Sequence, residues 1–404
     1  MPVDVPAVVA LEGVVRNYAW GSPTLIPHLL GVDPDATPVA ELWLGAHPDD
    51  PAGVPARDTT LDLLIAQDPV RMLGRDVITH FGERLPFLVK LLAAGTSLSI
   101  QVHPTIAQAQ AGFAAEDDAG VPRDAPNRNY RDDNHKPELI CALTPFEALC
   151  GFRPVADTLR LLDALAVPGL VEVRSLLASP HGLRAAFSYL LTLDSPQSLV
   201  ADVVAAAAAV GSDPAWAGPA RAVALTGADA PGDVGVVLSL LLNYVRLEPG
   251  EAIYLPAGNV HAYLRGLGVE IMANSDNVLR CGLTPKHVDV PELLKVTDFT
   301  PLLDPLFDGQ ADEFGAVFAV PVPDFKLLRV DLDAYKGSCT IGLHGPFVLL
   351  CASGGARIEC QGAAVDLTPG RAAFVSARDV GFTVAGSGTV FAATDGVYVP
   401  TPWS

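Results

Sequence analysis

Two short stretches of the chain carry side chains that could bind one metal ion together. The first contains Gln101, His103 and, further on, Glu138, and the second ends in His261. Alternate residues of an extended strand point to the same face, so Gln101 and His103 can reach one ion. Glu138 and His261 complete a set of four nitrogen and oxygen ligands, which suits zinc, although iron and manganese accept the same atoms. A single carboxylate leaves the ion positively charged, which favours an open, catalytic site.

These four residues alone do not decide the question, because a lone histidine in a strand is more often an ordinary polar residue than a ligand. The sequence around them carries five motifs: SIQVHP at 99–104, DNHKPE at 133–138, FEALCGFRP at 146–154, HAYL at 261–264 and SDNVLRCGLTPK at 275–286. In residue identity, order and spacing these motifs resemble those of the type I mannose-6-phosphate isomerases. The resemblance extends from YAWG at 18–21 to about residue 310.

The resemblance implies a zinc-dependent aldose–ketose isomerase, with one Zn²⁺ per chain, that interconverts mannose 6-phosphate and fructose 6-phosphate through an enediol or enediolate. It also implies a role in carbohydrate metabolism, including GDP-mannose biosynthesis, with the direction of the reaction left open. Such a reaction needs an acid/base group, an electrophile for the developing oxyanion, and a grip on the phosphate. The bound metal would supply the electrophile.

Candidates for the phosphate grip are basic side chains near the second stretch. Arg280 and Lys286 flank a turn at 282–285 that could aim both inward. Guanidinium offers a bidentate fork and ammonium a point charge. Arg280 could equally stabilise charge on the reacting carbons. The resemblance adds Lys90 and Ser99 as further substrate-binding candidates.

The acid/base group has several candidates. Lys136 lies two residues before Glu138, so both can face the metal, and a nearby cation would favour the neutral, basic form of the lysine. His135 could open the sugar ring, and the carboxylates Asp276 and Glu270 compete with these two for the acid/base role. For each of these residues a surface or supporting role remains an open alternative.

Composition limits the partners of this chain. Its formal charge of −20 argues against nucleic acid or an anionic membrane surface, and neither a targeting segment nor a membrane-spanning run is evident. We therefore expect a soluble, cytoplasmic monomer whose partner is a small-molecule sugar phosphate. The six cysteines show no CxxC spacing and are expected to be reduced and buried.

An internal echo indicates the fold. Residues 249–261 read PGEAIYLPAGNVH and residues 369–381 read PGRAAFVSARDVG, so a Pro-Gly turn leads into an alternating strand twice. This repeated pattern of turn and strand predicts a mainly β protein with two jelly-roll (cupin) barrels. Gly381 stands where His261 stands in the first copy, so the second barrel is expected to bind no metal.

Residues 155–246 have a different character. The segments 159–165, 205–209 and 236–245 have helical composition, which predicts an α-helical insertion domain. The catalytic barrel would then combine 1–154 with 247–310, and 311–404 would form the second barrel. With 404 residues, the chain is long enough for this division.

Two other functions are weighed against the isomerase. An iron-dependent cupin oxygenase uses two histidines and one carboxylate, and a glutamine ligand beside an anion grip fits it less well. A non-catalytic sugar-phosphate-binding cupin would not need an intact metal set next to Lys136 and Arg280. Metal analysis and an isomerase assay separate the three.

Overall fold

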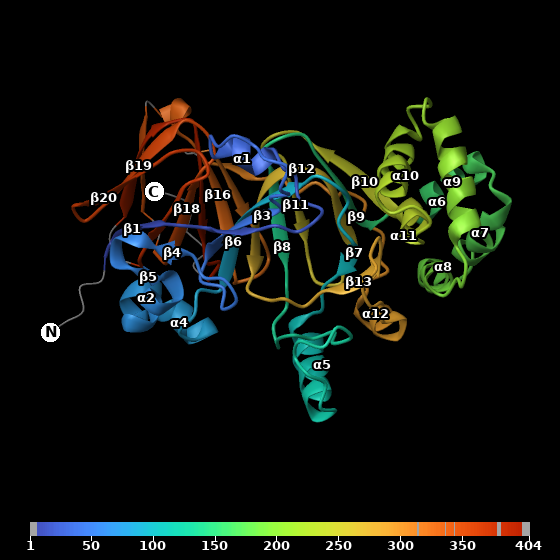
Figure 1. Ribbon diagram of the computed structural model, residues 1–404, viewed down its shortest axis with the longest axis horizontal. Helices are drawn as coiled ribbons and strands as arrows, with labels where there is room; N and C mark the ends of the chain where they lie inside the picture. Colours follow the sequence, from blue (N-terminus) through green and yellow to red (C-terminus); the bar gives the residue numbers. More distant parts are fainter. Residues whose placement is uncertain (1–5, 313–314, 336, 343, 378–380, 398–404) are drawn as a thin grey trace.

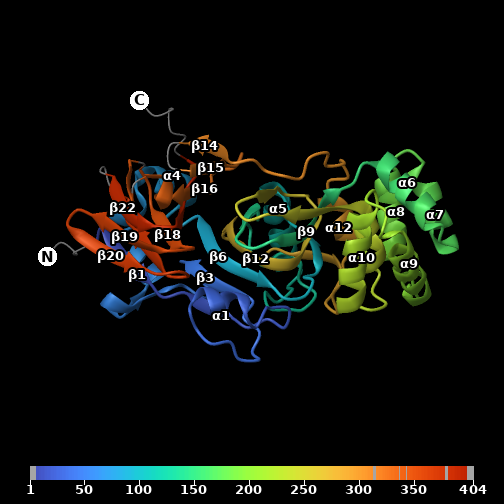
Figure 2. The ribbon, with the colours of Figure 1, turned by 90° about the horizontal axis from the view of Figure 1, so that it is seen from above.

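The computed structural model describes residues 6–312, 315–335, 337–342, 344–377 and 381–397. The protein is mainly β, as expected, and three parts follow one another along its long axis (Figure 1). The C-terminal strands lie at one end, a large sheet lies in the centre, and a group of helices lies at the other end. The segment between the helical end and β14 (Gln310–Asp312) runs back along the central part (Figure 2).

The central sheet contains ten strands joined by antiparallel pairings. Its main path is β10 (Leu242–Leu247), β9 (Phe146–Phe152), β12 (His261–Ala273), β6 (Phe87–Ala94), β3 (Glu41–Gly45) and β2 (Val14–Arg16). The other members are β7 (Ile100–Val102), β8 (Glu138–Ala142), β11 (Ala252–Leu255) and β13 (Leu279–Gly282). Strand β12 pairs with β6, β7, β8 and β9, so this one strand holds the sheet together.

The C-terminal part consists of two sheets. The seven-stranded sheet runs in the order β1 (Val8–Leu11), β21 (Ala372–Val375), β18 (Phe347–Cys351), β23 (Thr389–Thr394), β16 (Lys326–Asp331), β15 (Gly315–Ala319) and β14. The four-stranded sheet runs β17 (Ser338–Ile341), β22 (Phe382–Ser387), β19 (Gly355–Cys360) and β20 (Ala363–Leu367). Residues 8–11 were assigned from sequence to the catalytic barrel, but β1 pairs with β21 and extends the C-terminal sheet.

The two Pro-Gly turns of the sequence echo have matching structures. Gly250 has φ of 95° and Gly370 has φ of 77°, a left-handed backbone that glycine adopts without steric cost. Each turn leads into a four-residue strand at the corresponding place, β11 in one copy and β21 in the other.

Residues 155–241, within the range 155–246 predicted as a helical insertion domain, are largely helical. They contain α6 (Val155–Leu165), η2 (Pro168–Leu170), α7 (Val171–Leu177), α8 (Gly182–Leu191), α9 (Gln197–Val210), α10 (Ala217–Asp229), α11 (Gly235–Leu238) and η3 (Ser239–Leu241). The prediction of helix through residue 245 was wrong, because β10 begins at Leu242. Tyr244 and Val245 pair with Leu149 and Ala148 of β9, and a short apolar run does not distinguish helix from buried strand.

The remaining elements, short except for α5, lie in both β parts. They are α1 (Leu25–Leu29), α2 (Leu61–Gln67), α3 (Pro69–Leu73), α4 (Arg75–Phe81), α5 (Ile106–Asp118), α12 (Val290–Val296), η1 (Pro55–Arg57), η4 (Leu332–Tyr335), β4 (Gly53–Val54) and β5 (Thr59–Thr60). Among the described residues, no helix has the length and apolar character needed to cross a membrane. All six cysteines are buried and unbridged, as expected.

One hydrophobic core joins the central and C-terminal parts. It contains Leu91, Leu139 and Val269 from the central sheet, and Leu327 and Phe374 from the seven-stranded sheet, all of them at most 1% exposed. Because this core is shared, the C-terminal part is packed against the strands that carry the candidate site.

Candidate active site

The four predicted metal ligands come together at or beside the ends of β7, β8 and β12. Gln101 lies in β7, His103 follows it, and Glu138 and His261 are the first residues of β8 and β12. Nε2 of His103 lies 3.4 Å from Oε2 of Glu138, and Nε2 of His261 lies 3.2 Å from the same oxygen. Gln101 stands directly opposite His261, and their side-chain nitrogens are 3.3 Å apart. Directly opposed residues of an antiparallel pair share a face, which explains the convergence.

The hydrogen bonds of this group fit a divalent metal ion. Nδ1 of His103 lies 2.7 Å from the carbonyl oxygen of Asn277, and Nδ1 of His261 lies 3.0 Å from that of Asn259. If each Nδ1–H donates to its carbonyl, each Nε2 turns a lone pair toward Glu138. His103 Nε2 and Glu138 Oε2 are buried without a hydrogen-bond partner. Such orphaned polar atoms are costly unless a ligand satisfies them. For Gln101, the side-chain amide can turn over to present its oxygen.

The protonation of these residues also suits metal binding. Burial lowers the pKa of His103 to about 4, in spite of the nearby Glu138 carboxylate. Burial alone would raise the pKa of Glu138, but Lys136 and His103 hold it well below its usual range. The imidazole is therefore neutral and the carboxyl ionised at neutral pH, which are the forms that coordinate metal.

A second group of possible ligands, His47, Asp49 and Asp276, lies nearby but is less suited to hold an ion. Nδ1 of His47 accepts a hydrogen bond from the backbone nitrogen of Asp49, so this nitrogen is already used. Asp49 is exposed, and the carboxylate of Asp276 lies 3.7 Å from Nε2 of His47. The first group is the metal site that the geometry favours.

A buried charge network lies on the same sheet face as Glu138. Lys90 on β6 stands opposite Glu270 on β12, and its ammonium lies 3.3 Å from Glu270 and 3.6 Å from Glu41. Trp43 donates to Glu41 at 2.8 Å, and Tyr263 donates to Glu270 at 2.9 Å. Lys90 and Glu270, both predicted from sequence as site residues, are therefore paired with each other.

A β-bulge allows β12 to carry residues of both groups. His261 and Tyr263 are two residues apart and share a face, but Glu270 follows Tyr263 by an odd number of residues. The register of β12 against β9 shifts between Tyr263 and Arg265. The extra residue of a bulge reverses the alternation beyond it, so Tyr263 can still reach Glu270.

Three basic side chains, those of Arg131, Arg280 and Lys286, lie beside the metal ligands. Arg280 on β13 stands opposite Gln101, on the far side of β7 from His261. Burial, and then the nearby Arg131, lower the pKa of Arg280, while Arg280 itself lowers that of Lys286. In the part of the chain that the structure describes, we find no carboxylate paired with any of the three. The arrangement is that of a site for an anion.

The other predicted residues have individual environments. Lys136 is buried, with its ammonium 2.8 Å from Oε1 of Glu138. Nε2 of His135 lies 3.0 Å from Oδ2 of Asp324 in the C-terminal part. Asp276 faces His47, and Ser99 is half-buried just before β7.

Sequence reasoning missed several residues that shape the site. Asn277 is fully buried; its carbonyl oxygen contacts His103, and its side chain bonds the backbone of Arg131 and Asn134. Arg131 precedes the 133–138 motif, and this closeness could have identified it. Glu41 lies far from every motif in the chain, so no sequence signal points to it.

These observations define a class of protein. A β-rich chain whose strand ends bring two histidines, a glutamine and a carboxylate together beside unpaired cations has the residues of a metal-dependent enzyme for an anionic substrate. Residues 8–155 match the family described as phosphomannose isomerase type I, catalytic domain.

Relatives of known name cover nearly the whole chain. The mannose-6-phosphate isomerase of Salmonella typhimurium is 40% identical over 386 residues, which is 93% of this chain and 96% of the relative. That of Rattus norvegicus is 34% identical and covers 93% of this chain and 94% of its own. The chain therefore belongs to the type I phosphomannose isomerases, which are aldose–ketose isomerases.

Solved structures agree with this assignment. The mannose 6-phosphate isomerase of Salmonella typhimurium bound to fructose 6-phosphate and zinc has a TM-score of 0.86 and 37% identity, covering 96% of this chain and 100% of its own. A mannose 6-phosphate isomerase described as holo and zinc-bound has a TM-score of 0.85 and 36% identity over the same share of each chain.

Proposed function

We propose that this chain interconverts mannose 6-phosphate and fructose 6-phosphate, using one zinc ion held by Gln101, His103, Glu138 and His261. The observation that carries the proposal is the convergence of two imidazole nitrogens on one buried carboxylate oxygen, with two of the atoms lacking hydrogen-bond partners. The solved relative bound to zinc and fructose 6-phosphate supports both the metal and the substrate.

The proposal includes the finer description of the fold. The central sheet would be a catalytic jelly-roll (cupin) barrel formed by residues from 12–154 and 247–310. The C-terminal sheets would be a second, metal-free barrel, completed by β1. The matching turns at Gly250 and Gly370 support two related units.

In this reaction a proton moves between two adjacent sugar carbons through an enediol or enediolate. A bound zinc ion would act as a Lewis acid toward a sugar oxygen. Lys136 is the leading candidate for the base, because its ammonium reaches Oε1 of Glu138 and therefore lies beside the metal ligands. The carboxylate of Glu270 is held by Lys90 and Tyr263, which suits a fixed orienting role.

The phosphate would be held at the basic group. Arg131 disfavours the charge of Arg280, and both arginines disfavour that of Lys286, so a phosphate dianion beside these groups would relieve the repulsion. Arg280 is closest to the metal ligands in strand register, so it can also contact the reacting part of the sugar. His135 remains the candidate for opening the sugar ring, and Asp276, which faces His47, remains a competitor for the acid/base role.

The iron-dependent oxygenase remains a second candidate on one observation. The closest ligand group, His103, Glu138 and His261, has the two-histidine, one-carboxylate composition of non-haem iron sites. Gln101 at the same site, the basic group and the named relatives favour the isomerase instead. Metal analysis of the purified protein separates the two.

Replacing His261 with Ala tests the metal assignment. Bound zinc should fall, and turnover should fall with it by at least about 100-fold, because loss of a Lewis acid costs several kcal/mol. His80→Ala, which alters an exposed histidine on α4, is the matched control and should keep both zinc and rate. Elemental analysis and a coupled isomerase assay measure the two quantities. A folded His261→Ala protein with one zinc and full rate would refute the assignment.

A further inference from the structure

The segment that carries Lys136 is anchored to the central sheet on one side. The side-chain amide of Asn277 donates to the carbonyl oxygen of Asn134 at 2.8 Å, and the backbone nitrogen of Ala273 donates to that of Pro137 at 3.1 Å. These bonds fix the two ends of segment 134–137. They do not involve the side chain of His135, which lies between them.

The side chain of His135 is held by the C-terminal part. Its Nε2 lies 3.0 Å from Oδ2 of Asp324, a residue 189 positions further along the chain. The side chain of Asp324 is 3% exposed and that of His135 is 18% exposed. A carboxylate buried to this degree is stable only with a partner, and the ring N–H of His135 provides one.

Asp324 is itself rigidly placed. It precedes β16, and the next residue, Phe325, is fully buried in the core that the two parts share. Leu139, which follows Glu138 on β8, lies in the same core. The carboxylate therefore has a fixed position relative to the strand that presents Glu138.

We propose that Asp324 is a positioning residue of the isomerase and acts through His135. By accepting the ring N–H of His135, it fixes segment 134–137 and so holds the Lys136 ammonium beside Glu138. This gives the C-terminal part a direct role in the active site. The inference rests on the proposed function, which assigns Lys136 to the reaction.

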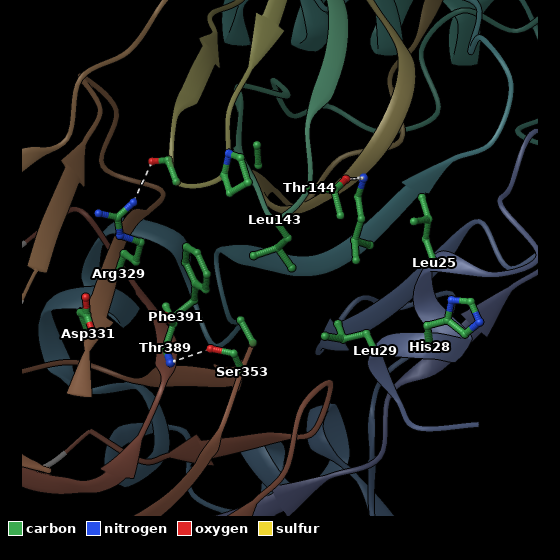
Figure 3. A pocket seen from close by; sticks show the side chains of 15 residues that line it. Leu25, His28, Leu29, Leu143, Thr144, Arg329, Asp331, Ser353, Thr389 and Phe391 are labelled. Carbon is green, nitrogen blue, oxygen red and sulfur yellow. Dashed lines mark hydrogen bonds between the residues drawn. The ribbon is translucent and has the colours of Figure 1, made fainter. Parts of the chain in front are cut away.

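A simple tether between the two parts is the competing explanation, and the chain offers a matched control for it. Arg329 of β16 donates through Nη1 to the carbonyl oxygen of Gly250 at 3.0 Å, beside a cavity of about 500 Å³ between the two parts (Figure 3). Gly250 bonds to Ala142, at the opposite end of β8 from Glu138. Four residues of strand separate these ends by about 13 Å. Arg329 therefore links the same two parts without reaching the site.

The test compares zinc-loaded full-length variants. Asp324→Ala should lower kcat by about 10- to 100-fold, since a misplacement of about 1 Å has this effect, while zinc content stays unchanged. Asp324→Asn keeps an oxygen acceptor for His135 and should recover most of the rate. Arg329→Met should lower Tm but leave kcat at the wild-type value. In a His135→Ala background, Asp324→Ala should cause no further loss, because its effect passes through His135.

A second measurement does not depend on activity. Hydrogen exchange of the backbone amides of residues 134–136 should accelerate in Asp324→Ala and not in Arg329→Met. The proposal would be overturned if Asp324→Ala kept the wild-type kcat and the wild-type exchange rates. It would also be overturned if the losses of kcat from His135→Ala and Asp324→Ala multiplied in the double variant, as independent effects do. An equal loss of kcat in Arg329→Met would assign the effect to tethering. If wild-type protein failed to isomerise mannose 6-phosphate, the proposed function would fail, while the exchange data would still decide whether Asp324 holds segment 134–137. If Asp324→Ala fails to fold, His135→Ala, which removes the other partner of this contact, carries the exchange test, and unchanged exchange at residues 134 and 136 would overturn the proposal.

Discussion

At the scale of single residues, two backbone carbonyl groups determine which nitrogen each histidine presents. Asn277 and Asn259 contact the Nδ1 atoms, which directs the Nε2 atoms of His103 and His261 toward Glu138. Sequence spacing predicted that Gln101 and His103, two of the four proposed ligands, reach one ion, because an i, i+2 pair on a strand shares a face. It could not identify the supporting carbonyls, because any residue type can supply one.

Arg280 tests the anion site. Charge-assisted contacts in desolvated oxyanion sites contribute about 3 to 4 kcal/mol, so Arg280→Ala should lower kcat/KM by about 100-fold or more with zinc retained. A rise in KM alone would indicate a phosphate grip used equally in ground and transition states, and a fall in kcat would indicate contact with the developing oxyanion.

The control for this variant is Arg246→Ala, which removes an exposed arginine paired with the exposed Glu248. It should leave steady-state kinetics unchanged, since exposed ion pairs contribute little. Near wild-type kcat/KM in folded, zinc-loaded Arg280→Ala would exclude both roles.

At the scale of elements, β6 and β12 hold a buried ion-pair network that the sequence conceals. All eight residues of β6 are buried, so apolar residues flank Lys90 without alternation and the pattern does not show which way Lys90 points. The bulge in β12 also disrupts simple alternation between His261 and Glu270. Register across strands, which depends on distant segments, was needed to place both residues on one face.

Lys90→Met tests this network through stability. It leaves Glu41 and Glu270 buried without their cation, so the free energy of unfolding should fall by about 3 to 5 kcal/mol at neutral pH. Chemical denaturation of the zinc-saturated proteins measures it. Lys295→Met, which removes an exposed lysine paired with the half-buried Glu292 on α12, should change stability by less than about 1 kcal/mol. An equal, small effect of both substitutions would contradict a structural role for the network.

The pH dependence of this difference has a definite sign. Burial alone would lower the pKa of Lys90, but Glu41 and Glu270 raise it above its usual value. The stabilisation by charged Lys90 is therefore fully present below the unfolded pKa of about 10.4 and is lost as pH rises through the folded pKa. The difference between wild type and Lys90→Met should stay constant from about pH 7 to 10 and narrow above that range.

At the scale of the whole molecule, local patterns predicted the composition of the parts better than their connections. The Pro-Gly echo correctly located β11 and β21, and the change in composition located the helical insertion. The pairing of β1 with β21 joins the two ends of the chain, and the contact of His135 with Asp324 joins two parts. Such contacts depend on packing between remote segments, which leaves no periodic signal in either one.

The most direct test of the account is a zinc titration of the metal-free, wild-type chain in an assay that converts mannose 6-phosphate to fructose 6-phosphate. Chelated protein should be inactive, and activity should rise linearly with zinc and stop rising at one equivalent per chain. That break point also tests the expectation that residues 311–404 hold no metal, where Gly381 stands in place of His261. Full activity in the chelated protein, or no activity with one zinc bound, would contradict the central claim.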